Sequence, residues 1–197
     1  MAQKSGKKEQ TRKRMLTAAS RSFREFGYSG VGVDGLAKAA DVTSGAFYAH
    51  FGSKAGAFDA SLNAGLDEVI EGLQNFQSEY GASWVNEFVE YYLGKQHRSE
   101  LACSCAMASL TSEVVRSEMK VHAAYEKKMS TIVNLVAAGL VAATDQERRN
   151  KAWAMLSILI GGLNVVLAMK NSKVADEVAK AVTISALKVA GRARSVK

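Results

Sequence analysis

The sequence predicts an all-α protein, and three observations support that fold class. Proline is absent from its 197 residues, while alanine and charged helix-forming residues are plentiful. Apolar residues recur at intervals of three and four through much of the chain. Long alternating runs of β-branched residues, which would indicate strands, are missing. We therefore expect about nine helices, divided between a small unit over residues 1–54 and a larger one over residues 55–197.

Positive charge is concentrated in the first quarter of the chain. Residues 1–55 contain ten Lys/Arg and four Asp/Glu, a net charge of +6, whereas residues 56–197 contain sixteen and fifteen, a net charge of +1. This asymmetry indicates a polyanionic partner for the N-terminal unit. Residues 1–8 are polar and basic, so we expect a solvated arm there, with contact to a minor groove of DNA as the alternative.

Three helices are predicted within residues 9–51. The first covers residues 9–26, with an apolar stripe that includes Phe23 and Phe26, and Gly27 is a suitable C-cap. Three short helices in this length of chain are what a helix-turn-helix domain requires.

A tight turn at Asp41 separates the second and third helices. Apolar spacing of i, i+3, i+4 and i+7 predicts the second helix, at Val33, Leu36, Ala37 and Ala40. Aspartate tolerates the left-handed backbone that a sharp turn often needs. Thr43 is a suitable N-cap for a third helix over residues 44–50, on which Phe47 and Phe51 both face inward.

The outward side of the third helix suits contact with DNA. Small side chains near its start allow a close approach to a groove, and Tyr48, His50 and Lys54 can hold phosphates. An ordinary helical hairpin is the alternative that spacing alone leaves open.

The N-terminal unit resembles a known family. The segment TRKRMLTAASRSFREFGYSGVGVDGLAKAADVTSGAFYAHFGSKAGAF is similar to the DNA-binding domain of the tetracycline-repressor (TetR) family of bacterial transcription regulators. The shared features are the T-R-x-x-(I/M)-L-x-A-A start, F-x-x-x-G-Y at the end of the first helix, and G-A-F-Y-x-H-F-x-S-K. Several fixed spacings agree at once, so the match is specific.

The resemblance implies that the third helix enters the major groove of double-stranded DNA. Tyr48, His50 and Lys54 would then hold the DNA backbone. Base edges would be contacted by a set of small residues with support from the second helix, namely Thr43, Ser44, Gly45, Ala46 and Ala49, with Val33 and Asp34.

Four departures from the family pattern concern the reading unit. The second helix begins at Val31-Gly32 where the family usually has Thr or Ser, and Gly35 lies inside it. Asp41 replaces a usual Gly, and Ser44 stands where Lys is common. The operator sequence therefore cannot be transferred from a relative.

A long amphipathic helix from Ser53 to about Gln77 is predicted to link the two units. Gly65 and Gly72 within it indicate either bending or close packing against another helix. Further helices are expected over residues 81–95, 104–115, 117–143, 146–169 and 173–191, with a polar connection over residues 94–102.

Aromatic residues of the second unit can form either its core or a ligand pocket. The resemblance implies a pocket for a small-molecule effector, bounded by the linking helix and those that follow. The residues that suit an apolar or aromatic ligand are Trp84, Phe88, Tyr91, Tyr92, Tyr125, Met129 and Trp153.

The last two predicted helices are apolar over much of their surface, and Gly161-Gly162 lies in the middle of the first. The resemblance implies that they pair with a second copy as a four-helix bundle. A dimer would read a palindromic operator with two helices about 34–36 Å apart. The residues expected in this interface or in the core are Trp153, Leu156, Ile160, Gly161, Val178 and Val182.

The segment ELACSCAMASLTSE resembles a G-C-x-x-(A/G)-x-L-x-x-E block of TetR regulators that include repressors responsive to electrophiles and oxidants. The block's single cysteine corresponds to Cys105, and Cys103 is an addition. At the start of a short helix, Cys105 would be favoured as a thiolate and could be modified. A purely structural role is the first alternative. A metal site with His97 and His122 is the second, but Cys-x-Cys spacing signals it only weakly.

The sequence therefore predicts a transcriptional regulator rather than an enzyme, acting as a homodimeric repressor. Release from the operator would follow small-molecule binding or cysteine modification by an oxidant or electrophile. An architectural DNA-binding protein without an effector and a thiol-based redox enzyme are the alternatives. No metal or cofactor is expected. We expect a cytoplasmic protein outside the membrane, because no run reaches about 18 uninterrupted apolar residues and the N-terminus lacks a signal-peptide core.

Overall fold

The computed structural model describes residues 2–196, with side chains from Lys8 onward. The all-α prediction is confirmed, and eight of the helices described have seven or more residues. The helices are α1 (Ala2–Gly30), α2 (Val33–Ala39), α3 (Ser44–Phe51), α4 (Lys54–Tyr80), α5 (Trp84–Tyr92), α6 (Lys95–Ser99), α7 (Ala106–Ser109), α8 (Thr111–Val115), α9 (Met119–Ala138), α10 (Asp145–Ala168) and α11 (Ser172–Ala190). Two 3₁₀ turns, η1 (Gly81–Ser83) and η2 (Leu101–Cys103), complete the described elements.

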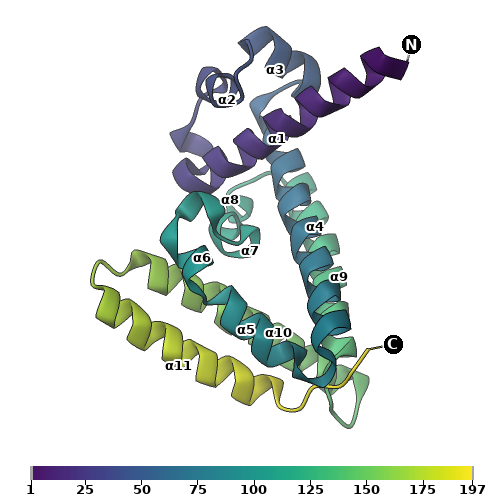
Figure 1. Cartoon of the computed structure of the whole chain (residues 1–197), viewed down its shortest axis with the longest axis vertical. Coiled ribbons are helices and arrows are strands. Elements are labelled where there is room, and N and C mark those ends of the chain that lie inside the picture. The colour runs from purple at the N-terminus through teal and green to yellow at the C-terminus, as the bar shows by residue number, and fades with distance from the viewer. Residues whose placement is uncertain (1, 197) are drawn as a thin grey trace.

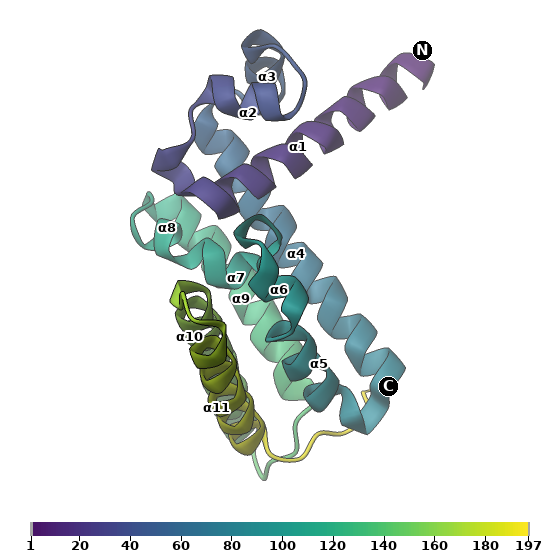
Figure 2. The ribbon, with the colours of Figure 1, turned by 60° about the vertical axis from the view of Figure 1, so that its left-hand side comes forward.

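The helices form two groups joined by α4 (Figure 1). Helices α1, α2 and α3 lie together at one end, and α4 runs from them along α9 toward the other end. Helices α10 and α11 pack side by side, with α5 against them, and both views show this pair on the far side of the molecule from α3 (Figure 2). The linking role predicted for α4 thus has a structural basis.

The core of the first group is built on α1. Met15, Ala19 and Phe23 are fully buried, one helical turn apart. Phe26, which was expected to share this stripe, is 55% exposed. Its place is taken by Tyr28, whose ring centre lies 5.3 Å from that of Phe58 on α4.

Gly27 ends the regular part of α1. Its φ of 70° is a left-handed conformation that favours glycine, as predicted for a C-cap. A Cβ at this position would lie 2.7 Å from Glu113 Oε1 of α8, but this carboxylate ends a flexible side chain that can move, so the positive φ is what favours glycine here. At the other end, α1 begins at Ala2 and not at Glu9, so the predicted arm continues the helix. Met1 and the side chains of residues 2–7 lie outside what the structure describes.

The turn between α2 and α3 has the predicted geometry. Asp41 has a φ of 53° and is the one non-glycine residue with positive φ in the described chain. Thr43 caps α3, because its side chain accepts a hydrogen bond from the Ala46 amide at 3.2 Å. Ser53 caps α4 in the same way, accepting from the Gly56 amide at 2.9 Å.

Two substitutions at Asp41 are expected to show whether the positive φ of this residue strains the backbone of the turn. Asp41→Gly should leave the free energy of unfolding nearly unchanged, whereas Asp41→Val should lower it by about 1–2 kcal/mol, because a β-branched residue is strained at positive φ. Urea denaturation followed by circular dichroism measures both. Equal stability of the two variants would show that the turn relaxes without strain.

The two glycines of α4 have different surroundings. A Cβ on Gly65 would lie 2.6 Å from Ala106 Cβ and 2.9 Å from Arg24 Nη2, so this glycine permits close packing. Gly72 has no atom within 4 Å of the position its Cβ would take and faces a cavity. Neither glycine is therefore needed for a bend.

The segment between α5 and α9 is more broken than predicted. The expected connection over residues 94–102 contains α6 and part of η2, and the expected helix over residues 104–115 is divided into α7 and α8. Ser109 and Thr111 donate side-chain hydrogen bonds to the carbonyls of Cys105 and Met107. Such bonds compete with continuation of a helix, which explains the division.

Helices α10 and α11 pack closely inside the protomer. A Cβ on Gly162 would lie 2.4 Å from Val182 Cγ1, so α11 rests directly on the backbone of α10. By length and composition, α10 alone among the helices of residues 2–196 could span a bilayer, a test that core helices also pass.

Candidate DNA-reading surface and regulatory cavity

The exposed side of α3 carries most of the residues predicted to contact DNA. Thr43, Gly45 and Ala49 are exposed, and Tyr48 is 50% exposed. Ser44, Ala46 and His50 are half-buried, while Phe47 is fully buried beneath them. The start of α3 therefore presents small side chains, with the aromatic side chain of Tyr48 beside them. This shape is suited to a DNA groove.

Asp34 and Ser44 join α2 to α3. The Ser44 hydroxyl donates a hydrogen bond of 2.6 Å to Asp34 Oδ1. Both residues were predicted as DNA contacts, but their pairing was not. The bond positions the Asp34 carboxylate at the rim of the reading surface, where an acceptor can meet the amino group of cytosine. Val33, the other α2 residue in the prediction, is half-buried against the core.

Two cations beside α3 are positioned by aromatic rings. Lys54 Nζ lies 4.4 Å from the centre of the Tyr28 ring, and the Arg12 guanidinium lies 5.8 Å from the centre of the Phe51 ring. These cation–π contacts hold both positive charges near the end of α3. Arg12 was missed as a site residue, because no local pattern relates residue 12 to residue 51.

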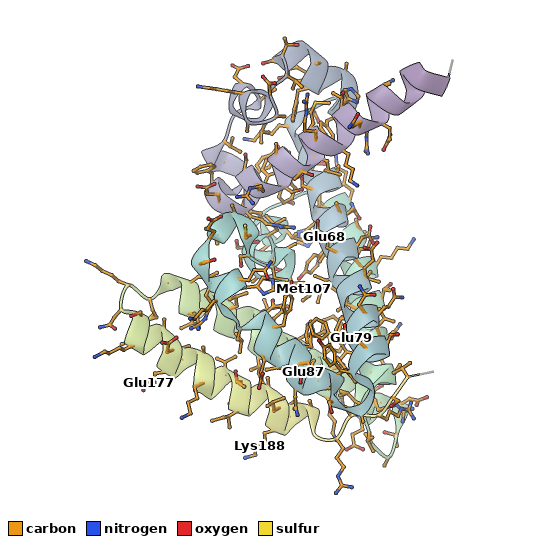
Figure 3. All side chains as sticks on the ribbon, viewed as in Figure 1. Glu68, Glu79, Glu87, Met107, Glu177 and Lys188 are labelled. Carbon is orange, nitrogen blue, oxygen red and sulfur yellow. The ribbon has the colours of Figure 1, made fainter. Side chains whose placement is uncertain are left out.

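A cavity of about 260 Å³ lies where α1 meets the second group of helices. Its walls come from α1, α4, α5, α6, η2 and α7. Figure 3 shows Glu68 on the stretch of α4 that passes below α1, and Met107 of α7 in the interior. Its lining includes Arg24, Glu68, Val69, Gly72, Phe76, Phe88, Tyr91, Tyr92, His97, Cys103, Ser104 and Cys105.

The cavity contains only part of the predicted effector set. Phe88, Tyr92, Cys103 and Cys105 line it, as does Tyr91. The other members of the predicted set do not line this cavity. Trp84 is fully buried, with its Nε1 donating to the Gly139 carbonyl at 3.3 Å.

Tyr125 and Met129 of α9 also lie outside the lining of this cavity. The Tyr125 hydroxyl forms a hydrogen bond of 2.7 Å with Thr111 Oγ1, and Met129 is buried in the core. Trp153 is partly exposed on α10. Periodicity identified these as inward-facing aromatic and apolar residues but could not show which inward positions face a void.

Polar groups of the cavity were largely missed by sequence reasoning. The Arg24 side chain is only 11% exposed and donates from Nη2 to Glu68 Oε2 at 3.0 Å. Ser104 and His97 are buried. Burial lowers the pKa of His97, whose Nδ1 lies 3.3 Å from the Tyr91 carbonyl, so the ring is neutral near pH 7. Arg24 belongs to α1, and no local pattern relates it to the helices that form the rest of the cavity.

Cys105 corrects one expectation. It precedes α7, as predicted, but it is buried, and burial raises the pKa of its thiol although the Met107 and Ala108 amides act in the other direction. The thiolate is therefore disfavoured. Burial likewise raises the pKa of Tyr92 well above its usual value. The Tyr92 hydroxyl faces the Cys105 thiol without a hydrogen bond of normal geometry.

Cys103 is the more accessible thiol. It is half-buried at the end of η2, and its Sγ accepts a hydrogen bond from Arg21 Nη1 at 3.1 Å. Arg21 also pairs with Glu100 at 3.4 Å, so η2 is tied to α1. The alternative metal site needs Cys103, Cys105 and a histidine together with a further ligand, and residues 2–196 bring no three metal-ligating side chains together.

Several exposed apolar residues lie on the outer sides of α10 and α11, among polar and charged ones. This α10–α11 face consists of exposed Trp153, Gly161, Val165, Val174 and Ile184. Figure 3 shows Glu177 and Lys188 pointing away from the protein along α11, so charged residues border the face. A Cβ on Gly161 would meet no atom within 4 Å, which leaves its backbone open to a partner.

The predicted interface residues are divided by the structure. Trp153 and Gly161 lie on the α10–α11 face, and Ile160 and Val178 are half-buried. Leu156 is fully buried in the protomer and cannot contact a partner. Val182 packs on Gly162 within the chain. On α10 and α11, the side that faces the core and the side that faces outward are equally apolar in sequence. Periodicity therefore could not distinguish an interface residue from a core residue.

Comparison with known proteins agrees with this architecture. Residues 15–60 match the family model for bacterial regulatory proteins of the tetR family. The reduced form of Escherichia coli NemR is 18% identical, with a TM-score of 0.70 over 88% of this chain and 95% of that one. SCO4454, a TetR-family transcriptional regulator from Streptomyces coelicolor, is 20% identical, with a TM-score of 0.72 over 92% and 94%. A regulator of that family from Agrobacterium tumefaciens is 13% identical, with a TM-score of 0.75 over 90% and 97%.

At these identities the solved structures show a shared fold, and no curated protein sequence matches the chain. The family model covers the three helices that carry the reading surface and the start of α4. The chain has the fold of TetR-family transcriptional regulators, and its residues 15–60, which include the helix-turn-helix, match the family model for bacterial regulatory proteins of the tetR family.

Proposed function

We propose that the protein is a cytoplasmic homodimeric repressor that binds a palindromic operator in double-stranded DNA and leaves it when a small effector occupies the cavity. The observation that carries this proposal is the capped helix α3, which presents small side chains and Tyr48 to solvent beside positively charged groups. Residues 1–54 act as the DNA-binding unit, and residues 55–197 bind the effector and the partner.

The proposed DNA contacts follow from the exposed side of α3. Thr43, Gly45 and Ala49 lie at the base edges, and Ser44 and Asp34 read them as a hydrogen-bonded pair. Tyr48, His50 and Lys54 hold phosphates. Ala46 stands close to the groove, and Val33 supports α3 from α2.

Dimerisation through the α10–α11 face supplies the second reading helix. An exposed apolar surface with a charged border is typical of a protein interface. One short helix gives modest affinity, whereas two joined helices bind one operator together.

Effector control is supported by the position of the cavity. Its walls include both α1, which carries the reading unit, and α4, which begins next to α3. A ligand can favour the conformation that does not bind DNA. If it binds that conformation about 2–3 kcal/mol more tightly than the DNA-binding one, operator affinity falls about 30- to 150-fold.

Selection from random duplex DNA, followed by footprinting, tests the proposal. We expect an inverted repeat whose half-sites are centred one helical turn apart, about 10 base pairs, or a multiple of it. Binding without sequence preference would instead identify an architectural protein. Catalytic consumption of peroxide with a thiol reductant would identify a redox enzyme.

Lys54→Ala is expected to weaken binding about equally on all DNA sequences and to reduce the slope of log affinity against log salt by about one unit. The reason is the loss of one phosphate contact from the ammonium held over Tyr28. Fluorescence anisotropy at several salt concentrations measures it. Lys127→Ala on α9 removes the same charge from an exposed site and is the control. A changed base preference with an unchanged slope would contradict this role.

Cysteine modification is a second candidate signal, and the accessible Cys103 favours it over Cys105. We expect N-ethylmaleimide to alkylate Cys103 at least about tenfold faster than Cys105 in the native protein, because reactivity requires access to the thiolate. Mass spectrometry of the wild type, Cys103→Ser and Cys105→Ser measures the two rates. Fast labelling that survives in Cys103→Ser and is lost in Cys105→Ser would reverse the assignment.

A further inference from the structure

We propose that the effector is a small organic acid, with one carboxylate and a planar apolar body, and that its carboxylate binds the Arg24 guanidinium inside the cavity. This inference rests on the proposed function, because it assigns the chemical class of the effector.

The cavity contains buried polar atoms that form no hydrogen bond of normal geometry within the described chain. These atoms are Arg24 Nε, Ser104 Oγ and Tyr92 Oη, the last of which faces only the Cys105 thiol, a weak partner. Tyr92 and Ser104 are almost completely buried, and all three residues line the cavity. Leaving such groups unpaired costs about 1–3 kcal/mol each, so a polar ligand that satisfies them gains affinity.

Arg24 presents the pair of donors that a carboxylate binds side-on. Nε and Nη2 lie on one edge of the guanidinium, and only Nη2 is engaged, by Glu68. A ligand carboxylate can accept from both atoms, which gives the stronger bidentate geometry. Glu68 can then turn outward into water, because its side chain is 68% exposed, and the cost of its release is the loss of its own pair with Arg24.

The charges around the cavity favour an anion over a cation. A cation would displace Arg24 from a site where only 11% of its side chain is exposed and would leave it unpaired. His97 is neutral near pH 7, and burial keeps the Tyr92 hydroxyl and the Cys105 thiol protonated. Arg24 is thus the buried cation of the cavity, and a ligand carboxylate would replace Glu68 as its partner.

The rest of the cavity suits a flat apolar body. Val69, Phe76, Phe88 and Tyr91 form its apolar and aromatic walls. The volume of about 260 Å³ is at the small end of ligand pockets. A molecule with a single aromatic ring and a short acid-bearing side chain matches both the size and the lining. Tyr92 and Ser104 can then bond a second polar group on the ring.

Binding to Arg24 would connect the effector with the DNA-reading unit. Arg24 lies on α1, and its guanidinium rests on Gly65 of α4 at 2.9 Å from the position of a Cβ. A carboxylate that draws the guanidinium into the cavity changes how α1 is seated on α4. The same acid therefore contacts both groups of helices.

Calorimetry with three acids and their primary amides tests the chemical class. The probes are benzoate, 4-hydroxybenzoate and 4-hydroxycinnamate. We expect at least one acid to bind the wild-type protein at least about tenfold more tightly than its amide, because the amide lacks the charge. Arg24→Gln should remove this preference, while Arg14→Gln, on an exposed site of α1, should keep it. Equal affinity for acid and amide, a preference retained in Arg24→Gln, or no binding of any acid at millimolar concentration overturns the proposal.

Filling the cavity from Gly72 provides a test that leaves Arg24 intact. Gly72→Leu should fold, because there is open space at this position, and should lose acid binding at least about tenfold, whereas Gly72→Ala should retain it. Circular dichroism checks folding. Acid binding that is undiminished in Gly72→Leu places the acid outside the cavity and overturns the proposal.

The DNA measurement separates the two proposals. If the wild type binds its selected operator but no acid binds in the cavity, the effector class is wrong and the regulator remains. If acid binds through Arg24 and the protein selects no operator, the proposed regulator fails while the acid site stands.

Discussion

Ile184→Glu is expected to convert the proposed dimer into monomers and to weaken operator binding about 10²- to 10⁴-fold. Ile184 is 58% exposed on the α10–α11 face, away from α3. A glutamate there would have to lose its water in an apolar interface without a partner, which opposes association. Light scattering gives the mass of the complex, and anisotropy gives the affinity for one and for two half-sites.

Val115→Glu is the matched control for this effect. Val115 is 69% exposed on α8, outside the α10–α11 face, so the variant should remain dimeric and bind the full operator. Binding to a single half-site should be similar in both variants, because α3 is unchanged. An Ile184→Glu protein that is still dimeric and binds the operator normally would exclude this face as the interface.

Gly162→Val is expected to lower the free energy of unfolding by about 1–3 kcal/mol through overpacking. Its Cβ would lie 2.4 Å from Val182 Cγ1 and 3.0 Å from Val182 Cβ, so turning the valine side chain alone does not relieve the overlap and α11 must shift. Removing a glycine from a helix interior would ordinarily stabilise it, so a loss of stability isolates the steric term. Urea unfolding at one fixed protein concentration measures the change, since the stability of a dimer depends on concentration.

Gly161→Ala separates this packing effect from helix propensity. A Cβ at residue 161 has open space in the protomer, so in the monomeric Ile184→Glu background the substitution should stabilise α10 by up to about 1 kcal/mol. Two neighbouring glycines would then respond with opposite signs. If Gly162→Val were as stable as the wild type, the close packing of α10 on α11 would not be rigid.

The DNA-reading unit was predicted in most of its local features because its signals are local. The N-cap at Thr43, the left-handed residue at Asp41 and the C-cap at Gly27 each depend on a few neighbouring residues. The family motif lies in the same segment. Phe26 was misplaced, since its burial depended on the path of the chain after Gly27 and on Tyr28.

The cavity could not be predicted because it depends on long-range contacts. Arg24 and Glu68 are separated by 44 residues, and Arg21 and Glu100 by 79. Periodicity showed that Trp84 and Met129 face inward, but a core position and a cavity position have the same pattern. Cys105 illustrates the same point, because the helix start was predicted and the surrounding protein that buries it was not.

The ion pair between Arg24 and Glu68 affects the concentration at which the proposed acid effector would act. Glu68 is tethered to the protein, so it competes with any incoming acid at an effective concentration that is on the order of millimolar for a short tether. In the proposed mechanism the protein thus carries its own competitor, which discourages a response to traces of acid and sets a concentration threshold. The tightness of this internal pairing, rather than the shape of the cavity alone, would then determine how much acid must accumulate before the genes under its control respond.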